Sequence, residues 1–326
     1  MRWLHHYATL LATASLLLIA AGALVTSTGS GLAVPDWPNT YGYFMFAFPL
    51  SKMVGGIFYE HGHRLIASVV GLLTIGLAIW LARRDARAWV RRLGWTALGA
   101  VILQGLLGGV TVLYFLPAPI SIGHAGLAQL FFVLVASLAL FTSPGWLAAY
   151  GRVTPLDDRL LERLALLLPA LIYVQILIGA AMRHTGAGLA IPDFPLAFGR
   201  IVPPEWTAAI AINYAHRTGA LLVAALAAAT VGHVLFHHRG RGELTRPAVL
   251  LGVLVAVQIG LGAWTVLSGR QVAINTAHVA AGAAVLATSV VLALRVLRGR
   301  FDEVTNRSAT GNSAVEPARA GSGVRA

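Results

Sequence analysis

Four histidines stand at matching positions in the two halves of this chain, each near the start of a long apolar stretch. The first half holds His63 and His124, and the second half holds His216 and His278. Imidazole binds metals and carries protons, so paired histidines are candidates for either kind of chemistry. A lone histidine in an apolar segment is more often a hydrogen-bonded packing residue. Four at equivalent positions favour two buried bis-histidine sites, because each uncompensated buried imidazole costs about a few kcal/mol.

A carboxylate distinguishes the two halves. Glu60 lies three residues before His63, whereas its equivalent in the second half is Asn213. If the helix already includes Glu60, this spacing puts both side chains on one face, with Cβ atoms about 5–6 Å apart. We expect Glu60 to accept a proton or to stabilise a cationic intermediate, so that one site does chemistry while the other transfers electrons. The alternative is a carboxylate that only interacts with the positive end of the helix dipole.

The apolar stretches that carry these residues are long enough to cross a lipid bilayer. Of the 326 residues, 57% are hydrophobic and 11% are charged, whereas a soluble domain has about 25% charged residues. Eight stretches come close to the ~20 residues that a helix needs to span the hydrocarbon core. They are continuous rather than alternating, which favours helices over barrel strands. They cover approximately residues 8–27, 65–82, 93–114, 122–142, 162–182, 207–236, 247–267 and 273–294.

The basic residues lie between the apolar stretches. The net charge of +12 therefore does not indicate binding to nucleic acid, which would need a basic face. The positive-inside rule predicts a multi-pass protein of the cell membrane with both termini in the cytoplasm. The first stretch is expected to be retained rather than cleaved, since its counterpart in the second half is internal. Arginines gather in the segments 83–92, 152–163, 239–246 and 295–300.

The chain is a tandem repeat. Thr28–Pro38 matches Thr185–Pro195, and Gln104–Leu113 matches Gln258–Leu267. Together with the histidine pairs, these matches keep offsets between 153 and 157 residues. Each half has an even number of spanning stretches, so both halves have the same orientation. A pseudo-twofold axis along the membrane normal is expected to relate them.

These patterns predict an all-α polytopic membrane protein with eight transmembrane helices in two tandem four-helix bundles. The N-terminal bundle is expected to cover residues 1–150 and the C-terminal bundle residues 151–300. Residues 301–326 are rich in alanine, glycine, serine and arginine, and we expect them to form a disordered cytoplasmic tail.

The four histidines are predicted to lie at one depth, because every even-numbered helix begins on the outer side. Within a four-helix bundle, the second and fourth helices can face each other across the core. Two imidazoles that project inward at one depth can ligate a single haem iron from both sides. Haem suits these positions better than zinc or a di-metal centre, since no inward carboxylate or thiolate completes either. The chain contains no cysteine at all.

Two arginines, Arg64 and Arg217, directly follow the first histidine of each pair. A guanidinium can clamp a carboxylate with two hydrogen bonds, and haem carries two propionates. The alternative is that these side chains extend to the membrane interface.

The repeated loops that follow the first and fifth helices hold two glycines and two prolines each, which predicts rigid caps over the sites. Asp36 and Asp193 in these loops are expected to accept hydrogen bonds from local backbone amides. His61 points to another side of its helix than His63 and is not assigned as a ligand. The remaining histidines have no matched partner and are interpreted as flank or loop residues: His5, His6, His184, His233, His237 and His238.

These motifs together resemble the haem A synthase family from the first helix to the eighth. The resemblance rests on Glu60-x-x-His63-Arg64, on the two Thr-Gly-x-Gly-Leu-x-x-Pro-Asp-x-Pro loops, and on the helix starts at His124 and His278. Many relatives in this family also carry a cysteine pair in an outer loop. This chain has none, so a thiol-based step is not expected here.

The resemblance implies an enzyme that oxidises the C8 methyl group of haem O to the formyl group of haem A, for cytochrome oxidase. It implies that His63 and His124 hold the substrate haem, that His216 and His278 ligate a resident haem b, and that Glu60 is the essential carboxylate. We expect successive hydroxylations, first to the alcohol and then to the gem-diol, which loses water. The expected partners are haem O, membrane lipid, a haem O-making prenyltransferase and an electron acceptor. A homo-oligomer is compatible with the pattern.

Two other functions compete with this prediction. A di-haem b-type electron-transfer protein linked to quinol explains the four histidines, but it gives no reason for a carboxylate in one half only. A transporter built from repeats needs no haem and predicts helices broken near the midplane.

Overall fold

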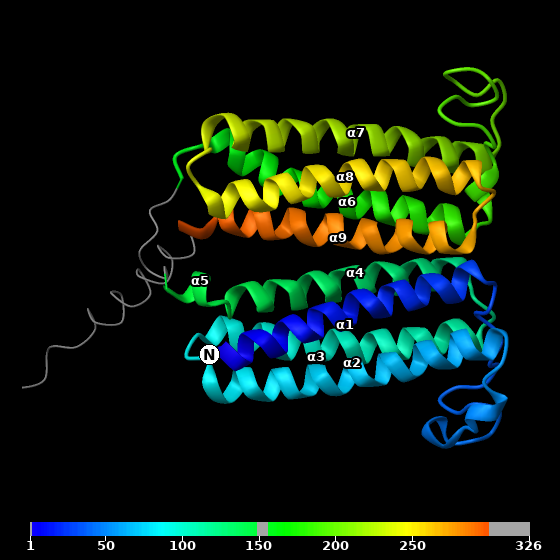
Figure 1. The fold of residues 1–326 in the computed structure, drawn as a ribbon. Helices are drawn as coiled ribbons and strands as arrows, with labels where there is room; N and C mark the ends of the chain where they lie inside the picture. Colours follow the sequence, from blue (N-terminus) through cyan, green and yellow to red (C-terminus); the bar gives the residue numbers. More distant parts are fainter. Residues whose placement is uncertain (1, 149–155, 300–326) are drawn as a thin grey trace, which may run out of the picture.

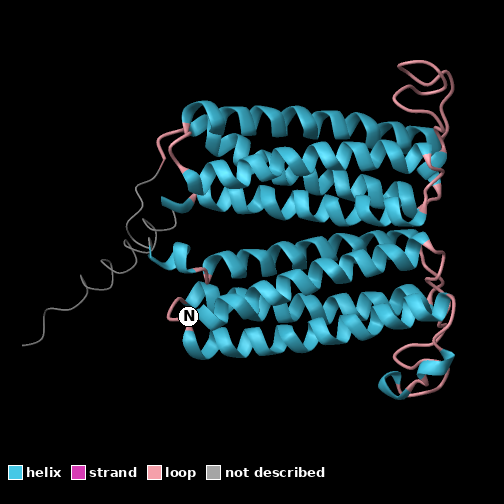
Figure 2. Ribbon diagram, in the orientation of Figure 1, coloured by secondary structure: helices cyan, strands magenta, loops and turns pink. Residues whose placement is uncertain are grey.

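The structure, a computed structural model, describes residues 2–148 and 156–299, and most of that length is helical (Figure 1, Figure 2). Three short 3-10 helices lie in the loops, at Met45–Ala47, Leu50–Lys52 and Ala187–Leu189. The α-helices are α1 (Arg2–Ser27), α2 (Gly56–Arg84), α3 (Ala88–Leu113), α4 (Ala118–Phe141), the short α5 (Pro144–Ala148), α6 (Arg159–His184), α7 (Ala208–His237), α8 (Gly242–Leu267) and α9 (Val272–Val296).

Eight of these helices are long and apolar enough to cross a membrane, which confirms the predicted all-α polytopic class. The shortest of them, α4, has 24 residues. At 1.5 Å per residue it extends about 36 Å, more than the ~30 Å of a hydrocarbon core. Large apolar side chains remain exposed along the outer faces of the helices, where a soluble protein would carry charges. Examples are Leu17, Leu72, Leu106 and Leu221.

The helices form two groups of four, one from each half of the chain (Figure 1). In the first group α1 contacts α2, α2 contacts α3, α3 contacts α4, and α4 closes the ring on α1. The second group repeats this ring with α6, α7, α8 and α9. Each ring encloses its own apolar core, built around Leu77 and Leu138 in the first half and around Leu168 and Leu251 in the second. Each helix therefore buries one face in the core of its own group.

The two groups meet through α1, α4, α6 and α9. Under the sequence repeat α1 corresponds to α6 and α4 to α9, so the α1–α9 and α4–α6 contacts are one contact with the halves exchanged. Hydrogen bonds also join the two groups at this interface. Arg183 of α6 donates hydrogen bonds of 2.8 Å to the carbonyl of Ala23 and to Ser27 Oγ, both in α1. The pseudo-twofold axis itself stays a prediction.

The long repeated loops lie at one end of the molecule, and the start of α1 lies at the other (Figure 1). Residues 28–55 connect α1 to α2, and residues 185–207 connect α6 to α7. The predicted disordered tail and the predicted boundary near residue 150 lie outside the described residues.

Candidate functional site

All four predicted ligand histidines lie near the end that carries the long loops. His63 follows the first residue of α2 by seven positions, His124 that of α4 by six, His216 that of α7 by eight and His278 that of α9 by six. These helices all begin at the same end of the molecule (Figure 1). A spread of two residues corresponds to about 3 Å along a helix axis. The four imidazoles are therefore almost level with one another.

Each pair comes from helices that lie diagonally across their ring. His216 of α7 and His278 of α9 have ring centroids 6.5 Å apart with an angle of 77° between the planes. A metal–imidazole bond is about 2.0–2.1 Å long, so one ion between the two rings can bond to both. In the first half, His63 of α2 and His124 of α4 lie close enough for their charges to interact. The structure thus brings together the pairs that the repeat predicted.

A glycine of a neighbouring helix stands against each of these imidazoles. A Cβ atom added to any of the four glycines would lie 2.8–3.1 Å from the Cε1 atom of its histidine, closer than ordinary van der Waals contact. The histidines therefore rest on bare helix backbone, and all four helices of each ring take part in the site. The contacts are Gly22 to His63, Gly108 to His124, Gly179 to His216 and Gly262 to His278.

Glutamine amides contact three of the four histidines. Gln175 Nε2 lies 3.0 Å from His216 Nδ1, and Gln104 Nε2 lies 3.3 Å from His124 Nε2. The repeat equivalent of Gln104 is Gln258, whose Nε2 atom lies 3.5 Å from the ring of the fourth histidine. The equivalent of Gln175 in the first half is the apolar Leu18, so the two sites differ in polarity.

The imidazole rings can still form further bonds through their nitrogen atoms. Within the part of the chain that the structure describes, Nδ1 of His63, His124 and His278 is buried without a hydrogen-bond partner. An unsatisfied buried polar atom costs about 1–3 kcal/mol, and a bond to a metal removes that cost. Paired imidazoles without a nearby carboxylate ligand match the axial positions of a bis-histidine haem. The residues therefore fit the group that the sequence predicts.

Glu60 and Arg64 connect the first loop to α2. Glu60 is buried, with 4% of its surface exposed, and its Oε2 accepts a 2.8 Å hydrogen bond from the Val34 amide. Its other oxygen forms a 2.7 Å ion pair with Arg64 Nη2. Arg64 also donates to three loop carbonyls, those of Val34, Asp36 and Asn39. The glutamate and the arginine together hold the loop over the helix that carries His63.

The second half repeats this connection without the charge. Arg217 Nε donates a 2.9 Å hydrogen bond to Asn213 Oδ1, and the same guanidinium donates to the carbonyls of Ile191, Asp193 and Leu196. The Asn213 amide in turn donates 2.9 Å to the carbonyl of Ala187. Glutamate and asparagine therefore make equivalent tethers, and only the glutamate adds a negative charge.

The hydrogen bonds of Arg64 and Arg217 give these two residues a role that the sequence did not predict. Both guanidinium groups bind loop carbonyls, whereas the sequence suggested propionates or the membrane interface. The propionate contact stays a prediction.

The loops are ordered as the sequence predicted. Asp36 accepts hydrogen bonds of 2.8 Å from the amides of Tyr41 and Gly42, and Asp193 accepts equivalent bonds in the second loop, which confirms the expected backbone contacts. Burial acts to raise the pKa of Asp36, but these amide hydrogen bonds outweigh it and lower the pKa overall. His61 is buried, and its Nδ1 lies 3.0 Å from Thr40 Oγ1, so it fastens the loop to α2.

Trp37 of the first loop packs against α3. A Cβ atom at Gly109 of α3 would lie 2.5 Å from Cδ2 of Trp37, so the indole lies directly on that helix, one residue beyond the glycine that supports His124.

The glycines of α1 and α6 belong to the site but were not predicted from the sequence. Gly22 and Gly179 keep the same 157-residue offset as the loops, and this match was available as a signal. This match alone did not reveal that the two glycines contact histidines, because glycines that ease helix packing are common in membrane helices.

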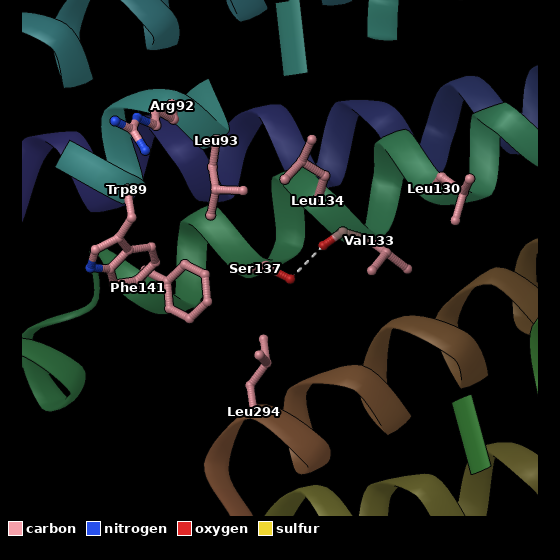
Figure 3. A pocket seen from close by; sticks show the side chains of 9 residues that line it. All are labelled: Trp89, Arg92, Leu93, Leu130, Val133, Leu134, Ser137, Phe141 and Leu294. Carbon is pink, nitrogen blue, oxygen red and sulfur yellow. Dashed lines mark hydrogen bonds between the residues drawn. The ribbon is translucent and has the colours of Figure 1, made fainter. Parts of the chain in front are cut away.

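The described cavities lie at the opposite end of the molecule. One of about 580 Å³ opens between α3, α4 and α9, where Leu294 faces Ser137 and Phe141 (Figure 3). Its walls are mostly apolar. The lining residue nearest to His124 along α4 is Leu130, six residues further on, which corresponds to about 9 Å, and none of the four histidines lines this cavity. This cavity is therefore separate from the histidine sites.

Comparison with known proteins identifies relatives over most of the chain. Residues 5–290 match the family described as cytochrome oxidase assembly protein. The chain is 32% identical to a haem A synthase of Symbiobacterium thermophilum, over 78% of this chain and 83% of that protein. It is 34% identical to the haem A synthase of Shouchella clausii, over 65% and 69% of the two chains. It is 27% identical to that of Geobacillus kaustophilus, over 91% and 93%.

Proposed function

The chain belongs to the haem A synthase family of cytochrome oxidase assembly proteins, and on this premise we propose that it oxidises the C8 methyl group of haem O to the formyl group of haem A. The observation that carries the proposal is the arrangement of four level histidines in two diagonal pairs, each supported by glycine on the flanking helices. Two equivalent haem sites in one membrane enzyme allow one to hold the substrate and the other to exchange electrons.

We assign the substrate to the half with the carboxylate. His63 and His124, in residues 1–150, would hold haem O, and His216 and His278, in residues 151–300, would hold haem b. A resident haem b supplies one-electron chemistry, which the stepwise oxidation of a methyl group requires. Each imidazole is positioned by the glycine behind it, so the ligands are set before the haem enters. The products along the way are the alcohol and the gem-diol of the substrate.

Glu60 is the proposed catalytic group. Its carboxylate is oriented by the Val34 amide and by Arg64, and it lies one helical turn before His63. A fixed negative charge at that place can hold a proton or stabilise positive charge that develops at the substrate edge. Asn213 makes the same tether without a charge, which supports a chemical rather than a structural reason for the glutamate.

Arg64 and Arg217 are proposed to act near the haem edge by keeping the capping loops closed. Contact between their guanidinium groups and haem propionates remains part of this proposal. It would require a propionate to share donors that now bind loop carbonyls.

The location follows from the arginine distribution. We propose that the enzyme lies in the cell membrane with both termini in the cytoplasm and the histidine end outward. Because haem O is lipid-soluble, direct transfer from the prenyltransferase that makes it is a reasonable route of supply. With water as the source of oxygen, each of the two hydroxylations releases two protons and two electrons, so an electron acceptor takes up four electrons in all.

Redox spectroscopy with haem extraction tests the proposal. Protein purified from cells that make haem O should yield haem b together with haem O or haem A. Cells that lack haem O should yield protein with haem b alone. If haem b alone is extracted in both cases, the chain is a di-haem electron-transfer protein instead.

A further inference from the structure

A cluster of one carboxylate and two imidazoles lies at the end of the second helix group opposite the proposed haem sites. Asp158 precedes α6, His233 lies in the last turns of α7, and His238 follows α7 directly. His233 lies 17 residues beyond His216 on the same helix, which corresponds to about 25 Å. The cluster is therefore separate from the chemistry described above.

The ligand atoms of this cluster converge. Asp158 Oδ2 lies 2.7 Å from His233 Nε2 and 2.8 Å from His238 Nε2, and all three atoms lie within 4.8 Å of one another. Around a tetrahedral ion with bonds of about 2.0–2.1 Å, ligand atoms are about 3.3 Å apart. To admit an ion, each carboxylate–imidazole distance would have to lengthen by about half an ångström, while the two imidazole nitrogens already lie no more than 4.8 Å apart.

The surroundings hold these groups in position. Asp158 Oδ1 accepts a 2.9 Å hydrogen bond from the Leu161 amide, so the carboxylate is oriented while Oδ2 stays directed at the imidazoles. The ring of His237 stacks on that of His233 at 4.4 Å. The carbonyl end of α7 faces this region and favours a cation. Supporting contacts of this kind are typical of metal ligands.

The cluster belongs to the second half alone. The repeat counterparts of His233 and His238 are Trp80 and Asp85, which cannot form it. Asp85 instead pairs with Arg87. The cluster is therefore not a by-product of the duplication that explains the four haem-site histidines.

We propose that Asp158, His233 and His238 form a binding site for a first-row divalent cation, with Zn²⁺ as its preferred ion. Two imidazoles and one carboxylate match the protein ligands of open zinc sites, and water supplies the fourth position. The three side chains are 12–17% exposed, which leaves a path for the ion and for that water. Binding replaces the two imidazole protons and links the beginning of α6 to the end of α7.

Zinc binding to the purified full-length protein in detergent tests this proposal. The protein should carry a streptavidin-binding tag, because an oligohistidine tag would bind zinc itself. Competition with a chromophoric chelator should give about one equivalent of Zn²⁺. The variants His233→Gln, His238→Gln and Asp158→Asn should each weaken binding at least ~10-fold, and the Asp158→Asn variant keeps a good helix cap.

His6→Gln is the matched control, since it removes an exposed imidazole of α1, in the other helix group, and its zinc affinity should equal that of the native protein. The absorption of bound Co²⁺ gives a second measurement on the unmodified chain, which should show the visible bands of a tetrahedral site. The proposal is overturned if the native protein binds no Zn²⁺ or Co²⁺, or if the three ligand variants bind as tightly as His6→Gln. Haem content should be the same in all four variants.

Discussion

The carboxylate of Glu60 and the guanidinium of Arg64 lie 2.7 Å apart on successive turns of α2, and both side chains are at most 10% exposed. The corresponding pair in the second half, Asn213 and Arg217, is joined at 2.9 Å by an uncharged amide. Equivalent side chains thus link the helix to the loop in both halves, but only the first half uses a negatively charged side chain. This difference allows the structural and chemical roles of the glutamate to be separated by experiment.

The substitution Glu60→Gln removes the charge and keeps a side chain of the same size and hydrogen-bonding reach. We expect both haems to remain bound, while conversion of haem O falls at least ~100-fold, the range typical of a lost acid–base group. Haem extraction measures both quantities in one sample. Glu205→Gln, which changes an exposed glutamate of the second loop in the same way, is the control and should leave conversion unchanged. A normal content of haem A in Glu60→Gln would contradict the catalytic assignment.

The substitution Gly108→Ala places a Cβ atom 3.1 Å from Cε1 of His124 and should displace that ring. We expect haem occupancy of the first site to fall about 10-fold, the loss typical when the support of a metal ligand is changed. Gly105→Ala, on the same helix, is the control, because a Cβ there meets no described atom within 4 Å. Gly179→Ala should have a larger effect on the second site, since its Cβ would lie 2.8 Å from His216. Equal haem content in all three variants would show that Gly108 and Gly179 do not support the histidine ligands.

The substitution Arg64→Lys replaces a planar group that binds three loop carbonyls by a single ammonium. We expect a loss of about 1–3 kcal/mol of stability, because carbonyls are left unpaired, and faster proteolysis within residues 28–55. Thermal unfolding and limited proteolysis measure these effects. Arg83→Lys, at the other end of α2, should change neither. A variant with a tight loop but reduced haem content would favour propionate binding over loop anchoring.

The aspartates of the loops predict how loop order depends on pH. Backbone amides of Gly199 and Phe198 lower the pKa of Asp193, so its contribution is fully present above the unfolded value of about 3.9. That contribution is lost only as the pH falls through the lower folded value. Proteolysis of residues 185–207 should therefore be constant between about pH 5 and 8 and increase below about pH 4. The variant Asp193→Ala should be cleaved faster than the native chain between about pH 5 and 8, and the difference should disappear at low pH. Equal cleavage rates of the two proteins at pH 7 would contradict this role of Asp193.

The amino-acid sequence by itself determined the class of fold and the identity of the four histidines. Span length and continuous hydrophobicity are local properties, and they predict membrane helices without knowledge of packing. The duplication then added information that the sequence of a single helix does not contain, because equivalent positions in two similar halves must lie at equivalent places in the structure. This is why the level of the histidines and the backbone contacts of Asp36 and Asp193 could be predicted.

Only the tertiary structure decided which groups face each other. The helices are apolar on nearly all sides, so no hydrophobic stripe in the sequence marks the inner face, and the contact of Gly22 with His63 depends on how α1 and α2 are rotated. Arg64 reaches loop residues 25–30 positions away, and Asp158 meets His233 across 75 positions. Contacts between residues so far apart in the sequence depend on the path of the chain through space. Residue spacing along one helix does not predict that path.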